Sequence, residues 1–141
     1  MSIQNNNDML VSEVMMPLER CPVIGERVIL KEALEVMGQS RLGIACIIGE
    51  DNLLLGIMTD GDIRRKLLKV QKPFSAFFID DALVHSIRTP TTIKPDVSLK
   101  EAVSLMGLKQ VWDLPVVDKQ NNLLGLLHLH PAIEALLGLR S

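Results

Sequence analysis

The spacing of apolar residues changes along the chain from a helical pattern to a strand pattern and back. From Leu30 to about Gln39, apolar residues recur at i, i+3, i+4 and i+7, which predicts a helix with one buried face. Two short aliphatic runs, Gly43–Ile48 and Leu53–Met58, follow with a polar turn between them and predict two strands. A second amphipathic stretch, about Asp62–Val70, begins directly after the second run. The first half of the chain is therefore expected to fold as helix, strand, strand, helix.

The same pattern returns later in the chain without a gap. Residues 30–68 can be aligned with residues 99–137 at a constant offset of 69, so that Leu-Leu-Gly ends at Gly56 and again at Gly125. Such an internal repeat indicates two copies of one supersecondary unit. The second copy should contain a helix, two strands and a last helix, at about Leu99–Lys109, Leu114–Val117, Asn122–Leu127 and from Pro131 onward.

A short strand before the first helix completes the expected unit of each copy. In the second copy this strand is brief and lies at Thr91–Ile93. Each unit then reads β-α-β-β-α and is too small to bury its own sheet. We therefore expect an α+β fold in which two repeats pack sheet to sheet with pseudo-twofold symmetry. The chain divides into a flexible N-terminus, a first repeat, a linker and a second repeat, at residues 1–10, 11–70, 71–83 and 84–138.

Composition narrows the class of protein. The chain has 141 residues, of which 48% are hydrophobic, and its formal net charge is −2. The hydrophobic content excludes intrinsic disorder. The slightly negative net charge argues against a protein that coats nucleic acid or an anionic membrane, because both need a basic surface. No apolar run reaches membrane-spanning length, so we expect a soluble, cytoplasmic chain. Cys46 lies in an apolar run and is expected to be a buried thiol, with a disulfide or a reactive cysteine as the minor alternative.

Candidate chemistry gathers where the second strand of the first copy meets its helix. Thr59 supplies a hydroxyl at the strand end, and Gly61 allows close approach of the backbone. The carboxylate of Asp62 could accept two vicinal sugar hydroxyls, and the free N–H groups of the helix start favour an anion. Arg64 and Arg65 add donors suited to phosphate. This set of residue types would recognise a ribose joined to a phosphate.

A simpler interpretation of the same residues stays open. Asp60 or Asp62 would also serve as an ordinary helix cap, and the two arginines would also suit a solvated helix face. Caps are far more frequent than ligand sites, so the residue types alone do not decide between the two.

The motif Gly-Ile-Met-Thr-Asp-Gly-Asp at Gly56–Asp62 resembles the G-h-h-T-x-x-D signature of CBS domains, and the duplication resembles a CBS pair, or Bateman module. The resemblance covers about Val11 to Leu137. More narrowly, Gly56–Arg65, together with Leu114–Asp118 and Gly125–His130, is similar to the C-terminal CBS pair of arabinose-5-phosphate isomerases.

The resemblance implies a regulatory module that binds a nucleotide and forms a homodimer. Thr59 would contact phosphate, Asp62 would hold the ribose hydroxyls, and Asp60 and Gly61 belong to the same motif. Thr92 and Ile93 would wall the base. The implied ligand is AMP, ADP, ATP or a CMP-activated sugar, and the implied partner is a sugar-phosphate isomerase or a nucleotidyltransferase of sugar-phosphate (Kdo-type) metabolism; no cofactor is implied.

The second copy departs from the motif. His128 stands where threonine is usual, and Pro131, which offers no acceptor, stands where the ribose aspartate is usual. We therefore expect one competent site per chain, with His128 as a structural or phosphate-contacting residue. His128, His130 and His85 also permit a metal hypothesis, but no acidic or cysteine ligand accompanies them in sequence, and we predict no metal site.

Three functions remain distinguishable. The first is a nucleotide-sensing regulatory module. The second is an enzyme, which we do not expect because no nucleophile–base pair is evident and the chain starts a few residues ahead of the module, without a sugar-isomerase domain. In that case the chain would be the detached regulatory part of an isomerase. The third is a dimerisation or interaction module with vestigial ligand clefts.

Overall fold

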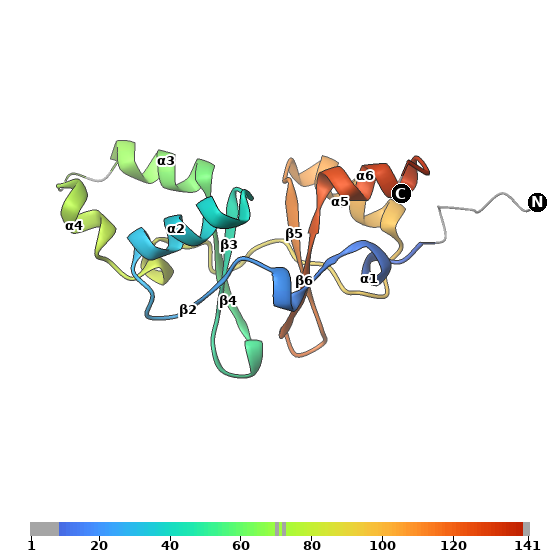
Figure 1. Cartoon of the computed structure of the whole chain (residues 1–141), viewed down its shortest axis with the longest axis horizontal. Coiled ribbons are helices and arrows are strands. Elements are labelled where there is room, and N and C mark those ends of the chain that lie inside the picture. Colours follow the sequence, from blue (N-terminus) through green and yellow to red (C-terminus); the bar gives the residue numbers. More distant parts are fainter. Residues whose placement is uncertain (1–8, 70, 72, 140–141) are drawn as a thin grey trace, which may run out of the picture. The chain divides into compact units, whose positions relative to one another are not determined.

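The computed structural model describes residues 9–69, 71 and 73–139 (Figure 1). The chain forms two compact units. Unit 1 combines the start of the chain, up to Arg20, with everything from Thr91 onward, and unit 2 comprises residues 21–90. Most of the expected flexible N-terminus, residues 1–8, lies outside the described residues. No described helix has both the length and the apolar character needed to cross a membrane.

Unit 2 is built on a three-stranded sheet in the order β2-β3-β4. Strand β2 runs parallel to β3, and β3 runs antiparallel to β4, as the predicted hairpin requires. The elements of this unit are β2 (Val23–Gly25), α2 (Leu30–Ser40), β3 (Ile44–Ile48), β4 (Leu54–Thr59), α3 (Asp60–Lys69), α4 (Phe74–Phe78) and the 3₁₀ helix η4 (Ala82–His85).

Unit 1 has the same helix, hairpin and helix, but its sheet has the order β1-β6-β5, so that β6 is central and antiparallel to both neighbours. Its elements are α1 (Val11–Val14), β1 (Met16–Pro17), the 3₁₀ helix η2 (Leu18–Arg20), α5 (Leu99–Lys109), β5 (Asp113–Val117), β6 (Leu123–His128) and α6 (Leu129–Leu136). The chain is thus mixed α/β, with one three-stranded sheet in each unit among the described residues, and the repeat read from the sequence is confirmed.

The two copies agree even in their irregularities. The β3–β4 ladder shifts register between Ile47 and Ile48, and the β5–β6 ladder shifts between Val116 and Val117, at the same offset of 69. The strand expected at Thr91–Ile93 is reduced to a single parallel bridge from Ile93 to Val116.

The repeats in sequence and the units in space do not coincide at the leading segment of each copy. Val11 and Val14, which open the first copy, are buried in unit 1, where α1 packs against α5 and α6 (Figure 1). Conversely, Ile87 near the start of the second copy belongs to unit 2, where its N–H donates to the Ile57 carbonyl at 2.8 Å and its carbonyl accepts from the Ile57 N–H at 3.0 Å. Each unit therefore takes its edge segment from the other copy.

The segment interpreted as a linker, residues 71–83, is packed onto unit 2. Helix α4 lies within it, and Phe77 is 1% exposed in the unit 2 core beside Leu30 and Ala82. Phe77, with the partly buried Phe78, therefore completes the core of unit 2. Cys21 and Cys46 are both buried, as expected for Cys46 from its apolar run.

Candidate functional site

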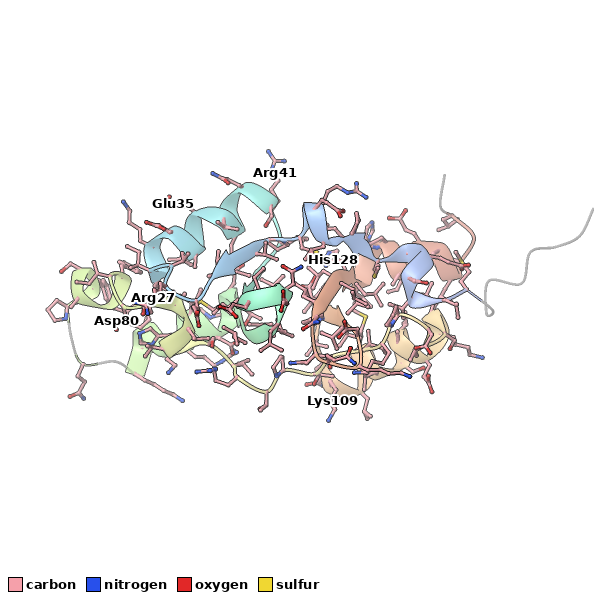
Figure 2. The ribbon with its side chains drawn as sticks, turned by 90° about the horizontal axis from the view of Figure 1, so that it is seen from below. Arg27, Glu35, Arg41, Asp80, Lys109 and His128 are labelled. Carbon is pink, nitrogen blue, oxygen red and sulfur yellow. The ribbon has the colours of Figure 1, made fainter. Side chains whose placement is uncertain are left out.

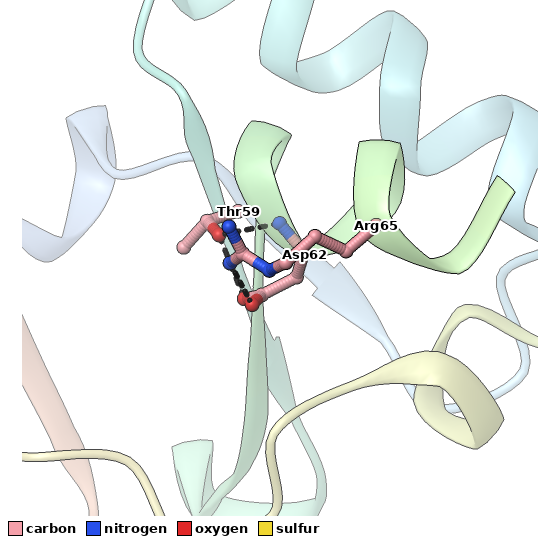
Figure 3. A network of polar contacts seen from close by, with 3 residues as sticks. All are labelled: Thr59, Asp62 and Arg65. Atoms are coloured by element: carbon pink, nitrogen blue, oxygen red, sulfur yellow. Dashed lines mark hydrogen bonds and ion pairs between the residues drawn. The ribbon is translucent and has the colours of Figure 1, made fainter. Parts of the chain in front are cut away.

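Three polar side chains meet where β4 ends and α3 begins (Figure 3). The Asp62 N–H donates to Thr59 Oγ1 at 3.2 Å, and the Thr59 hydroxyl donates in turn to Asp62 Oδ2 at 2.7 Å. Arg65 Nη2 donates to the other carboxylate oxygen, Oδ1, at 2.7 Å. Thr59 thus caps the helix, and the side chain of Asp62 is held between a hydroxyl and a guanidinium.

The carboxylate of Asp62 keeps capacity for a ligand. Its two oxygens offer about four lone-pair positions, and the hydroxyl of Thr59 and the guanidinium of Arg65 use two of them. The side chain is 20% exposed, so its remaining lone pairs can be reached from outside. Asp62 can therefore accept two further hydrogen bonds, for example from two neighbouring hydroxyl groups.

This network borders a pocket of about 200 Å³ in unit 2. Helix α3 contributes Asp62, Arg65, Lys66 and Lys69, which stand at i, i+3, i+4 and i+7 and so share one helix face. The opposite wall is the segment that enters unit 2 from the second copy, His85–Ile87. The pocket therefore combines one carboxylate with three cationic groups.

His85 is the most buried polar residue of this pocket wall, with 9% of the residue exposed. Its Nε2 lies 2.8 Å from Asp80 Oδ2, and its ring centroid lies 4.5 Å from that of Phe77. Since a carboxylate only accepts, Nε2 carries a proton, and Nδ1 has no hydrogen-bond partner among the described residues. His85 fixes the wall of the pocket against the unit 2 core.

Two residues predicted at the site lie elsewhere. The N–H of Asp60 donates to the Gly43 carbonyl at 3.0 Å, and Asp60 lines a different pocket of about 320 Å³ beside Arg41. Arg64 is exposed and is not among the residues that line the α3 pocket. Helical geometry explains this, because position 64 is two residues from Asp62 and faces away from it. Gly61 lies beside the guanidinium of Arg65, which would stand 3.1 Å from an added Cβ.

The remaining predicted residues belong to unit 1. Thr92 and Ile93 line a pocket of about 380 Å³ at the start of α5, together with Lys94, Val97, Glu101 and Leu105. His128, labelled in Figure 2, ends β6, and its Nδ1 lies 2.8 Å from Asp113 Oδ1 on the paired strand β5. His130 lies 2.6 Å from Glu134 within α6. Among the described side chains, no three His, Cys, Asp or Glu residues gather closely enough to hold a metal ion.

In unit 1 the His128–Asp113 pair occupies the positions that Thr59 and its strand partner occupy in unit 2. At the matching positions of unit 2 the cross-strand partners are Thr59 and Ile44. Burial raises the pKa of the Asp113 carboxyl above its ordinary value, and the hydrogen bond and charge of His128 only partly oppose this effect. In unit 1 the histidine is therefore held by a buried carboxyl group of its own sheet.

Sequence reasoning missed five lining residues of the α3 pocket. Helical spacing could have predicted Lys66 and Lys69, because they follow Asp62 at i+4 and i+7. No local pattern predicts His85, Ser86 and Ile87 at this pocket, since the antiparallel bridge between Ile57 and Ile87 brings their segment there.

Comparison with known proteins gives a consistent family. The family described as CBS domain matches residues 11–69 and 83–137. An uncharacterized protein of Helicobacter pylori is 36% identical over 126 residues, covering 85% of this chain and 35% of that protein. A probable arabinose 5-phosphate isomerase of Haemophilus influenzae is 34% identical over 108 residues, covering 77% of this chain and 31% of that protein. The chain spans about a third of the length of these curated relatives.

Solved structures agree on the fold. CBSX2, a CBS-pair protein of Arabidopsis thaliana solved in complex with AMP, superposes with a TM-score of 0.81 at 22% identity, covering 94% of this chain and 99% of that one. The CBS domain pair of MJ0100, in complex with 5′-methylthioadenosine and S-adenosyl-L-methionine, gives 0.73 at 20% identity, covering 92% and 96%. All three ligands of these two proteins contain adenosine.

Proposed function

This chain belongs to the CBS domain family, with two copies of the domain, and from that premise we propose that it is a non-catalytic regulatory module that binds an adenine nucleotide in unit 2. The observation that carries the proposal is the α3 pocket, where the carboxylate of Asp62 and the cations Arg65, Lys66 and Lys69 line one helix face. A carboxylate suits the hydroxyls of a ribose, and the cations suit its phosphate. The adenosine ligands of CBSX2 and MJ0100 support this class of ligand.

Thr59 has a positioning role in this proposal. Its hydroxyl donates to Asp62 Oδ2 and fixes that oxygen at the helix start, in the pocket that the cations also line. Arg65 Nη2 holds the other oxygen, and the Arg65 side chain is 58% exposed, so its remaining N–H groups can reach a phosphate while the ion pair with Asp62 stays intact.

The size of the pocket suggests that it holds only part of the ligand. Its volume of about 200 Å³ is below the range of about 300–1,000 Å³ typical of pockets that enclose a whole small molecule. We assign the sugar and phosphate part of the ligand to this pocket. The same chemistry would suit a pentose phosphate, and the similarity to a probable arabinose 5-phosphate isomerase makes that the second candidate.

A homodimer and a link to a sugar-phosphate isomerase or nucleotidyltransferase remain part of the proposal. Trp112 and Leu108, beside the end of α5, are 71% and 79% exposed, which suits burial against a second copy better than exposure to water. The regulated enzyme would be a partner or an attached domain, since the relatives extend well beyond the length matched here.

The test is a thermal-shift panel of AMP, ADP, ATP, cytidine nucleotides, a CMP-activated sugar and arabinose 5-phosphate. A ligand at about a hundred times its dissociation constant should stabilise the fold by about 2.7 kcal/mol, a shift of several degrees. Asp62→Ala should abolish the shift, because the ribose hydroxyls lose their acceptor.

The outcomes separate the candidate functions. A shift with arabinose 5-phosphate and none with nucleotides would replace the first candidate by the second. If no compound shifts the melting temperature, the chain is an interaction module with vestigial clefts. An isomerase assay on this chain should show no turnover, and turnover would contradict the non-catalytic role.

A further inference from the structure

The segment that leads each copy is bound to its unit by the same backbone hydrogen bonds. In unit 2 the Leu30 N–H donates to the Asp80 carbonyl at 2.8 Å, and in unit 1 its counterpart Leu99 donates to the Met9 carbonyl at 2.7 Å. With these two carbonyls aligned, the 3₁₀ helix η4 covers the same positions as α1. The two leading segments therefore correspond residue by residue, at an offset of 71.

This correspondence places His85 at the position of Val14. Val14 is 6% exposed in the core of unit 1, whereas His85 is 9% exposed and lines the α3 pocket. Asp80, whose Oδ2 lies 2.8 Å from His85 Nε2, stands at the position of Met9. Since apolar side chains occupy both positions in unit 1, the fold does not require the pair of His85 and Asp80.

His85 keeps one buried nitrogen without a partner. Nε2 donates to Asp80, so Nδ1 of the neutral ring is an acceptor, and it has no hydrogen bond within the part of the chain that the structure describes. A buried polar atom of this kind costs stability until a partner reaches it. The oxygens of an anion only accept, so an anion can pair with Nδ1 only when that nitrogen carries a proton as well. An anion against this wall therefore favours the charged ring.

The charges around His85 act in opposite directions on this second proton. Asp80 favours it, whereas the three cations of the α3 face oppose it while the pocket holds no anion. Strand β4 and helix α4, which also pack against η4 and His85, contain no charged residue. The charged residues that line the pocket, or that lie on the segments hydrogen-bonded to this one, are Glu26, Arg27, Asp62, Arg65, Lys66, Lys69, Asp80, Asp81 and Arg88. An anionic ligand offsets the cations and so removes their opposition.

We propose that His85 takes up a proton when an anionic ligand enters the α3 pocket, so that binding at this site strengthens as pH falls. This inference rests on the proposed function and adds a regulation of the same site. The range in which to measure it is about pH 5–8, where histidine side chains ordinarily change charge.

Titration calorimetry of AMP in buffers of different ionisation enthalpy counts the protons taken up per ligand and gives the affinity at each pH. The phosphate of AMP titrates equally with every variant, so the difference between wild type and variant reports on the protein. Compared with His85→Val, which copies the residue of unit 1, the wild type should take up roughly half a proton more at about pH 7. From about pH 7.5 to 6 its affinity should rise about three- to tenfold relative to the variant, since one linked proton changes affinity at most about tenfold per pH unit.

Two further variants and a second ligand complete the test. His85→Gln keeps a polar side chain that cannot gain a proton, and it should behave as His85→Val does. His130→Gln removes a histidine of unit 1 whose side chain is 79% exposed, and it should match the wild type. Adenosine, which has no phosphate, should cause no such proton uptake.

The outcomes separate this inference from the proposed function. AMP binding with the same proton uptake and pH dependence in the wild type and both His85 variants would overturn the inference and leave the proposed function standing. Proton uptake of the same size with adenosine would also overturn it, because the proton would then not respond to an anion. If no nucleotide binds the wild type, the proposed function fails and the inference fails with it.

Discussion

Gly56 and Gly125 occupy equivalent positions in β4 and β6, and each faces the backbone of the edge segment beside its strand. A Cβ on Gly56 would stand 2.9 Å from the Ile87 carbonyl oxygen, and a Cβ on Gly125 would press on the Met16 carbonyl. Backbone cannot move aside as a side chain can. Both copies therefore keep glycine where the neighbouring segment approaches most closely.

This close approach gives a prediction with an internal control. Gly56→Ala should destabilise the chain by about 1–3 kcal/mol through overpacking. Gly38→Ala, in the last turn of α2 where an added Cβ meets nothing within 4 Å, should instead stabilise it by up to about 0.5–1 kcal/mol. Urea unfolding of the two variants measures both values. Equal effects would mean that the Ile87 segment does not press on Gly56.

Asp113 makes the stability of the fold depend on pH. Because burial raises its pKa in the folded chain, the folded chain holds this proton more tightly than the unfolded chain. The contribution is intact below the ordinary pKa of 3.8 and is lost as pH rises through the raised pKa. Asp113→Asn keeps an oxygen that can accept from His128 but cannot ionise.

The wild type should therefore lose stability relative to Asp113→Asn as pH rises from about 3 to 5.5, below the range where histidines ordinarily titrate. Urea unfolding of both proteins across this range measures the difference in unfolding free energy. Parallel curves would show that the Asp113 pKa is the same in the folded and unfolded chain.

At the scale of elements, α3 and α6 begin alike and differ in what their first turns offer. Thr59 and Asp62 form a hydrogen-bonded helix start in unit 2, whereas His128 and Pro131 stand at those positions in unit 1. Pro131 is tolerated there because the N–H groups of a first helical turn have no intrahelical partner. The helix tolerates the exchange, but unit 1 has no carboxylate at the position of Asp62.

Pro131→Asp should accordingly leave the ligand-induced thermal shift unchanged or enlarge it. In the absence of ligand the variant should gain about 0.3–1 kcal/mol, since an acidic residue in the first turn suits the helix dipole. Thermal unfolding with and without ATP measures both effects. Loss of the ATP-induced shift would mean that the binding site involves α6 as it stands.

The elements were more predictable than the site. Helical spacing from Leu30 and the two aliphatic runs were enough for α2, β3 and β4, because local periodicity follows directly from which face is buried. Thr59, Asp62 and Arg65 were predictable because one helix start brings them together. Ser86 and His85 were not, since their place at the pocket depends on a bridge between residues far apart in sequence, which no local pattern encodes.

At the scale of the whole molecule, each compact unit depends on a segment from the other repeat. Val11 is 0% exposed in the core of unit 1, although it opens the first repeat in sequence. The sequence repeat shows to which copy a residue belongs, and its burial shows to which compact unit it belongs. The two assignments differ for the segment that leads each copy, because that segment packs in the other unit.

Val11→Ala should cost about 1–3 kcal/mol, and the loss should appear in unit 1. Relative to the wild type, the variant should lose more amide protection against hydrogen exchange in residues 91–139 than in residues 21–90. Val84→Ala removes the same atoms from a side chain that is 68% exposed and should change stability by less than about 0.5 kcal/mol. Protection lost mainly in residues 21–90 would contradict the assignment of Val11 to unit 1.

We propose that this duplicated fold carries a single ligand site. Titration calorimetry of the wild-type chain with ATP can test this proposal, because the binding stoichiometry counts sites without reference to their position. We expect one nucleotide bound per chain, and none bound by Asp62→Ala. Two nucleotides per chain, or one that binds Asp62→Ala as tightly as the wild type, would contradict it.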